Sequence, residues 1–101
     1  MKLIVRHEAD EEFYLAFEKY ELEESGLGVR FGNEVRRFLR QIEGDPMRMR
    51  PRRVLDFEYR RVNLKSFPYY IAYSIERKTI FVLTISHGHQ KPEHWIGRDS
   101  P

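Results

Sequence analysis

The fold is decided by residues 61–86, which read RVNLKSFPYYIAYSIERKTIFVLTIS. Over residues 61–67 apolar side chains alternate with basic or polar ones, which is the period of a β-strand with one apolar and one basic face. Residues 69–75 form a second predicted strand, rich in Tyr and Ile. A polar turn then leads into residues 79–86, the most apolar segment of the chain. The stretch therefore predicts three consecutive strands, the last two joined as a hairpin.

Upstream of these strands the spacing of apolar residues changes to that of an α-helix. The predicted buried face of a first helix holds Ala9, Phe13, Ala16, Phe17 and Tyr20. The same spacing recurs in a second helix, with Phe31, Val35, Phe38, Leu39 and Ile42. The face opposite this second apolar stripe holds Arg30, Asn33, Glu34, Arg36, Arg37 and Arg40. Both helices are therefore predicted to be amphipathic.

The sequence also marks where these helices begin and end. Acidic residues cluster over 8–12, where negative charge favours a helix N-terminus. Ser25 and Gly26 supply a stop, with Gly26 suited to a left-handed cap. Residues 44–46, Gly-Asp-Pro, end the second helix because the residue before a proline is disfavoured in helical conformation. Two amphipathic helices joined by so short a break are expected to pack as an antiparallel hairpin.

The element order predicts the fold class. Residues 2–6 are interpreted as a short buried strand, and residues 47–53 as a basic, irregular segment. The order β-α-α-β-β-β indicates an α+β domain of two layers, with the helical hairpin packed on a small, mainly antiparallel sheet. A chain of 101 residues fits a single domain, spanning 1–101.

Composition excludes several classes of protein. The chain has no cysteine, so disulfides and thiolate metal sites are excluded. The N-terminal apolar run is only three residues, Leu3 to Val5, too short for a secretory or membrane segment. We therefore expect a cytoplasmic protein with no membrane partner.

Charge is distributed unevenly along the chain. Residues 1–29 carry three Lys or Arg against eight Asp or Glu, whereas residues 30–61 carry ten Arg against five acidic residues. Arginine suits planar, bidentate contacts with phosphate. The pattern has two interpretations: a well-solvated surface with ion pairs between its acidic and basic parts, or a basic surface for a polyanion.

The predicted strand over 61–67 offers one candidate basic site. Arg61 and Lys65 are expected to share a face, with Asn63 between them, because side chains two apart on a strand point the same way. Such a face can bind a phosphodiester backbone or stabilise the charge that develops on its cleavage. The target-binding candidates around it are Arg52, Arg53, Arg60, Lys91 and Trp95.

Aromatic rings near this face have two interpretations. Tyr69, Tyr70, Tyr73 and Trp95 can stack on unpaired bases. So small a domain also needs large rings in its core, and we expect at least two of the three tyrosines there.

Histidines 87, 89 and 94 follow the last predicted strand. They lack a fourth ligand and a helical i, i+4 pair, so we predict no metal site. His87 is a candidate acid/base group or phosphate contact, or simply caps the strand. The chain has no Gly-rich phosphate loop, paired-carboxylate spacing or nucleophile elbow, so hydrolases and nucleotide-dependent enzymes of the standard types, and a cofactor, are not expected.

Four stretches together carry a family resemblance: residues 26–31, 44–46, 61–73 and 85–95. In order and spacing they resemble the RelE/ParE superfamily of bacterial toxins from type II toxin–antitoxin systems. The resemblance implies one of two activities. RelE-like members cleave messenger RNA on the ribosome with basic side chains and no metal, whereas ParE-like members bind and poison DNA gyrase without being nucleases. In both, a cognate antitoxin wraps the toxin.

The resemblance slightly favours the ParE-like branch. Ribonuclease members tend to have an arginine where this chain has Tyr70, and often another where it has residues 89–91, His-Gln-Lys. The Phe-Pro-Tyr entry at 67–69 and the Pro-Glu-His-Trp ending at 92–95 are closer to ParE-like sequences.

The alternatives remain a ribosome-dependent mRNA endonuclease and a non-toxic RNA- or protein-binding module of the same fold. In the nuclease hypothesis Arg61 and Lys65 stabilise the transition state, and His87 or His89 transfers protons. For the antitoxin, we expect an apolar groove on the helical hairpin at Phe13, Phe17, Phe31, Val35 and Phe38.

Overall fold

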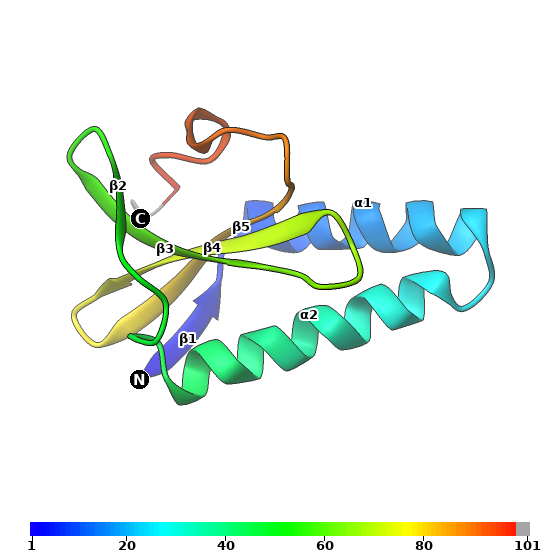
Figure 1. Ribbon diagram of the computed structural model, residues 1–101, viewed down its shortest axis with the longest axis horizontal. Coiled ribbons are helices and arrows are strands. Elements are labelled where there is room, and N and C mark those ends of the chain that lie inside the picture. Colours follow the sequence, from blue (N-terminus) through cyan, green and yellow to red (C-terminus); the bar gives the residue numbers. More distant parts are fainter. Residues whose placement is uncertain (99–101) are drawn as a thin grey trace.

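Five strands form one mixed sheet in the order β1-β5-β4-β3-β2. The computed structural model describes residues 1–98. Its elements are β1 (Lys2–Val5), α1 (His7–Glu23), α2 (Leu27–Gly44), β2 (Arg52–Val54), β3 (Phe57–Asn63), β4 (Tyr69–Glu76), β5 (Thr79–His87) and a short 3₁₀ helix (Pro92–His94). Strand β1 runs parallel to β5, and all other neighbouring strands are antiparallel. Figure 1 shows α1 and α2 as an antiparallel hairpin, with the segment after β5 on the far side of the sheet from α2. The predicted α+β class and helical hairpin are confirmed.

Strand β2 is an addition to the predicted order. We expected residues 47–53 to be irregular, but Arg52–Val54 pairs with Phe57–Tyr59 at the start of β3. Three residues, two of them arginine, are too few and too polar to show the alternation by which a strand is recognised. The pair also extends β3 upstream of the predicted position 61, and a two-residue turn with Leu55 at φ 54° joins the two strands.

The helical hairpin depends on one close approach of backbones. Gly28 is buried at the start of α2, and a Cβ atom there would lie 2.5 Å from the backbone oxygen of Phe17. Gly26 adopts the predicted left-handed conformation, with φ 90°, but it lies at the start of α2 rather than at the end of α1. The Glu21 carboxylate accepts hydrogen bonds from the backbone N–H groups of Gly26 and Val29, which fastens α1 to the first turn of α2.

Glu34 does not lie on the exposed face of α2 where we predicted it. Its side chain is only 4% exposed and accepts hydrogen bonds from the backbone N–H groups of Lys65, at 2.6 Å, and Ser66, at 3.0 Å. Burial by itself raises the pKa of Glu34, but the hydrogen bonds from Ser66 and Lys65 and the charge of Arg37 outweigh it and leave the pKa below its ordinary value. Glu34 therefore ties α2 to the loop between β3 and β4.

The sheet has a core on each face. On the helix face, the apolar side of α2 packs with Ile71, Tyr73 and Val82. On the other face, which we call the tail face, a second cluster consists of Tyr59, Tyr70, Ala72, Leu83 and Trp95. A β-bulge places Ala72 opposite Thr84 and Tyr73 opposite Val82, so Leu83 is the extra residue. The bulge shifts the alternation of β5, and Ile85 rather than Thr84 joins the helix-face core.

No helix within residues 1–98 is long and apolar enough to cross a membrane.

Candidate functional site

Arg61 lies on the tail face of the sheet. Its guanidinium stands 3.8 Å above the ring centroid of Tyr70, and its Nε donates a hydrogen bond of 2.9 Å to Oδ1 of Asn63. Arg61 and Asn63 therefore share a face, as the strand pattern predicts. This cation–π contact holds the guanidinium over the Tyr70 ring, beside the C-terminal segment, and the Arg61 side chain is partly exposed there.

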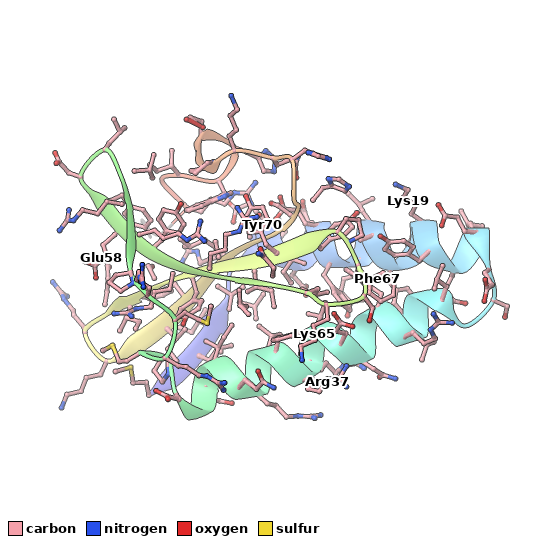
Figure 2. The ribbon with its side chains drawn as sticks, viewed as in Figure 1. Lys19, Arg37, Glu58, Lys65, Phe67 and Tyr70 are labelled. Carbon is pink, nitrogen blue, oxygen red and sulfur yellow. The ribbon has the colours of Figure 1, made fainter. Side chains whose placement is uncertain are left out.

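Lys65 lies on the opposite side, which corrects the prediction that it shares a face with Arg61. Strand β3 ends at Asn63, so the two-residue alternation does not continue to Lys65. The exposed Lys65 lines a cavity of about 250 Å³ together with Phe38 and Ile42 of α2. Figure 2 shows Lys65 pointing toward α2 and Tyr70 toward the C-terminal segment.

The histidines form no metal site. The rings of His87 and His89 stack with their centroids 5.1 Å apart, and His87 contacts Tyr69 on the helix side of the sheet. His94 instead bonds through Nε2 to the Glu12 carboxylate at 2.8 Å. In the part of the chain that the structure describes, no three His, Asp or Glu side chains come together as metal ligands.

The two candidate charge-stabilising residues of the nuclease hypothesis do not converge. Arg61 lies on the tail face, whereas Lys65 lies beside α2. His87 and His89 stack on each other at the end of β5. A phosphodiester cleavage site needs its charge-stabilising and proton-transfer groups around one phosphate. Arg61 and Lys65 together do not form such a site.

Trp95 is buried, so the prediction that its ring is available to a target is wrong for this structure. Its side chain is 1% exposed, its Nε1 donates to the Tyr70 hydroxyl at 2.8 Å, and it packs edge-on against Tyr59. Tyr70 in turn donates to the backbone oxygen of Gln90 at 2.8 Å. Tyr70 and Tyr73 are both core residues, which confirms the expectation that at least two of the three tyrosines are buried.

The remaining target-binding candidates differ in whether their side chains are bound within the protein or exposed. Arg60 donates to the backbone oxygens of Met47 and Met49, so it holds that segment in place. Arg53 is 3.9 Å from Glu58 across the β2–β3 hairpin and donates to the backbone of Asp56. Arg52 and Lys91 are exposed. Arg52 and Arg53 thus lie together near the hairpin tip, whereas Lys91 belongs to the C-terminal segment.

The five residues predicted to line an apolar groove for the antitoxin differ in burial. Phe31, Val35 and Phe38 lie in the core, while Phe13 and Phe17 are only half-buried. An open groove of about 570 Å³ separates α1 from β5 and the C-terminal segment. Its lining includes Leu15, Ala16, Lys19, Tyr69, Ile85 and His87. Beyond Val82, β5 has no strand neighbour on the β1 side within residues 1–98, so this groove runs beside a free strand edge.

Sequence reasoning missed Glu12, which joins α1, β5 and the C-terminal segment. Its carboxylate accepts hydrogen bonds from the Thr84 hydroxyl at 2.7 Å and the Ile85 backbone at 3.2 Å, and pairs with Arg98 at 3.0 Å as well as with His94. The signal was present, however, because Glu12 lies at i+3 from Ala9 and i−4 from Ala16, on the buried stripe of the helix.

Comparison with known proteins agrees with this architecture. Residues 3–92 match the family model described as "ParE toxin of type II toxin-antitoxin system, parDE". The chain belongs to this family. Among curated proteins no relative is found. A solved structure titled "Chromosomal ParDE TA system from P. aeruginosa" superimposes with a TM-score of 0.74, covering 86% of this chain and 95% of that one. The two sequences are 16% identical, so the likeness is one of fold.

Membership of the ParE toxin family confirms the resemblance inferred from the sequence, including the preference for the ParE-like branch. Members of this family are the toxin component of a type II toxin–antitoxin system, which implies an antitoxin partner. Among the ion pairs within residues 1–98, Arg30 and Arg53 each lie 3.9 Å from a carboxylate and Arg98 lies 3.0 Å from one.

Proposed function

We propose that this ParE family toxin acts on DNA gyrase and is neutralised by a cognate antitoxin. The observation that carries the proposal is the separation of Arg61, on the tail face, from Lys65, which lies beside α2. This separation disfavours cleavage of RNA by these groups. Action through binding, as the ParE resemblance implies, requires no catalytic cluster.

The β2–β3 hairpin is the surface that we propose for the target. Its two-residue turn carries Leu55, which is 86% exposed, next to the exposed Arg52 and Arg53. An apolar side chain flanked by arginines is suited to a protein contact, since arginine is enriched among the residues that dominate interface energies.

A supercoiling assay tests the target. Purified toxin added to gyrase, ATP and relaxed plasmid is expected to inhibit supercoiling and to accumulate cleaved plasmid. The double variant Arg52→Ala/Arg53→Ala should require roughly tenfold more protein, consistent with the loss of one interface hot spot. Its matched control is Arg77→Ala/Lys78→Ala, which removes two cations from the exposed β4–β5 turn.

Expression in bacteria separates this proposal from its alternatives. We expect growth arrest with intact messenger RNA and damaged chromosomal DNA. Cleavage of ribosome-bound transcripts that disappears in Arg61→Ala/Lys65→Ala would reject the gyrase proposal in favour of the endonuclease. Harmless overexpression without any antitoxin would instead favour the non-toxic binding module.

For the antitoxin, we propose the groove between α1 and β5. Leu15 is 68% exposed at its edge and Lys19 lies one turn away, so the groove suits an apolar segment that carries negative charge. The edge of β5 beyond Ile85, whose N–H is bound by Glu12, offers backbone groups to an extended segment. Leu15→Glu should weaken antitoxin binding about 10- to 100-fold, the usual range for an apolar anchor. Leu22→Glu is the control, because Leu22 is 89% exposed on the same helix but outside the groove.

A further inference from the structure

The solvent face of α2 is a continuous row of cations. Arg30, Arg36, Arg37 and Arg40 are all exposed and, at about 100° per residue, fall within about a third of the helix circumference. From Arg30 to Arg40 the row extends about 15 Å along the helix axis. This row is separate from the β2–β3 hairpin and from the groove beside α1.

The carboxylate of Glu34, which lies between these arginines in the sequence, is bound mainly by backbone groups, although it also interacts with the charge of Arg37. Glu34 is buried beneath the helix, where its oxygen accepts two backbone hydrogen bonds from the β3–β4 loop. Arg30 is 3.9 Å from Glu24, and Arg36 donates to the neutral amide of Asn33. For Arg40, the structure shows no ion pair with any carboxylate of residues 1–98. The row therefore keeps most of its positive charge.

Lys65 adds a further cation beside the row, at the cavity that it lines with Phe38 and Asp45. Its backbone N–H binds Glu34, whose carboxylate also interacts with the charge of Arg37, so the loop brings Lys65 beside the middle of α2. Both side chains are exposed, and Figure 2 shows them on the same side of the molecule. We call Arg30, Arg36, Arg37, Arg40 and Lys65 the basic ridge.

The clustering of these cations on α2 does not stabilise the fold. Like charges three or four residues apart on a helix, such as Arg36 and Arg40, repel each other and destabilise it. The exposed ridge also contributes nothing to either core. A polyanionic ligand would relieve the repulsion.

We propose that the basic ridge binds the phosphate backbone of duplex DNA without regard to sequence. Guanidinium groups bind phosphate oxygens in bidentate fashion, and a row about 15 Å long reaches several phosphates of a duplex, which carries one charge per about 1.7 Å of axis. The rings that stacking on single strands would need are absent from the ridge, since Tyr70, Tyr73 and Trp95 are buried. Apart from Val29 at its N-terminal end, the ridge presents no large apolar side chain for insertion into a lipid surface.

The test is fluorescence anisotropy with a fluorescein-labelled duplex of about 20 base pairs and mixed sequence, titrated at several NaCl concentrations. For four to five neutralised phosphates, log K should fall against log[NaCl] with a slope of about −3.6 to −4.5. The variant Arg36→Gln/Arg40→Gln should bind more weakly, and its slope should be shallower by about 1.8. The matched control, Arg77→Gln/Lys78→Gln, removes the same charge from a remote turn and should keep most of the wild-type slope.

Thermal unfolding of the same proteins excludes a merely structural role for the ridge. Relief of like-charge repulsion predicts that Arg36→Gln/Arg40→Gln unfolds at the same temperature as the wild type or slightly higher. Weaker binding by a variant of undiminished stability supports the proposal. Equal weakening by the control variant would show that only net charge matters and would overturn it. Tighter, ridge-dependent binding of a labelled single-stranded RNA would overturn the assignment to duplex DNA.

The proposal goes beyond the action on gyrase and is tested independently of it. No gyrase or antitoxin is present in the binding assay, so a failed supercoiling assay leaves the ridge result intact. Conversely, loss of DNA binding in the ridge variant does not alter what Arg52→Ala/Arg53→Ala reports about gyrase.

Discussion

Glu12 is the residue on which attachment of the C-terminal segment depends most. Its side chain is 18% exposed and meets Arg98, which is 16% exposed, as well as His94 and the free edge of β5. A largely buried carboxylate between two potential cations is hard to replace, because its removal leaves positive charge without compensation. The segment that carries Trp95 is thus held to α1 by one side chain.

We predict that Glu12→Ala lowers the free energy of unfolding by about 3 kcal/mol, the usual loss when one partner of a buried ion pair is removed. Trp95 is the only tryptophan, so its emission should shift to longer wavelength in the native variant as the segment loosens. Urea unfolding followed by fluorescence and circular dichroism measures both effects. Glu11→Ala is the control, since Glu11 pairs with His7 on the exposed side of the helix. Unchanged emission in Glu12→Ala would contradict this role.

Glu34 predicts a dependence of stability on pH. Its pKa is lower in the folded chain than in the unfolded one, so its contribution is complete above the unfolded value near 4.5 and is lost as pH falls through the folded value. Between pH 6 and pH 3 the wild type should therefore lose more stability than Glu34→Gln, whose side chain does not titrate. Urea midpoints of both proteins at the two pH values measure the difference. Parallel loss in both would show that Glu34 is not the responsible group.

At the scale of elements, the crossing of α1 and α2 at Gly28 is the tightest constraint. A methyl group there meets the Phe17 backbone and the Glu21 side chain at 2.5 and 2.6 Å, so the helices must move apart. We predict that Gly28→Ala destabilises the fold by about 1–3 kcal/mol, the range for overpacking. Gly44→Ala, with nothing within 4 Å of the added methyl, should be neutral or stabilise by up to about 1 kcal/mol. Thermal unfolding of the two variants gives the comparison, and equal midpoints would contradict it.

The helices and strands also show which structural features could be predicted from the sequence and which could not. The stripes of α1 and α2 and the apolar run of β5 were predictable, because burial of a whole face imposes a period. Strand β2 was not, since its three residues pair only because β3 begins early. Lys65 was predicted on the wrong face because side chains alternate between the two faces only within a strand, and β3 ends at Asn63. Glu12 and Glu34 were missed as buried groups because their partners lie far away in sequence, on β5 and the β3–β4 loop.

For the whole molecule, the C-terminal segment is a third layer over the sheet. Trp95 covers Tyr59 and Tyr70 on the tail face, so a chain that ends at His89 exposes that cluster. We predict that truncation after His89 lowers the free energy of unfolding by more than about 3 kcal/mol, as removal of a buried tryptophan does. The truncated chain should also bind more of the dye ANS. Full-length Lys91→Gln is the control, because Lys91 is exposed on the same segment. A truncated chain of native stability without ANS binding would contradict the layer's role.

The parallel pairing of β1 with β5 also determines when, during synthesis, the toxin can complete its fold. Residues 2–5 leave the translating ribosome well before their partners, residues 79–82, have been synthesised. Closing so large a loop is slow compared with forming local helices, so the nascent chain has only its helical hairpin ready while translation continues. Synthesis interrupted before residue 79 therefore leaves a fragment without the completed sheet, and the cell meets an assembled poison only after β5 has been translated.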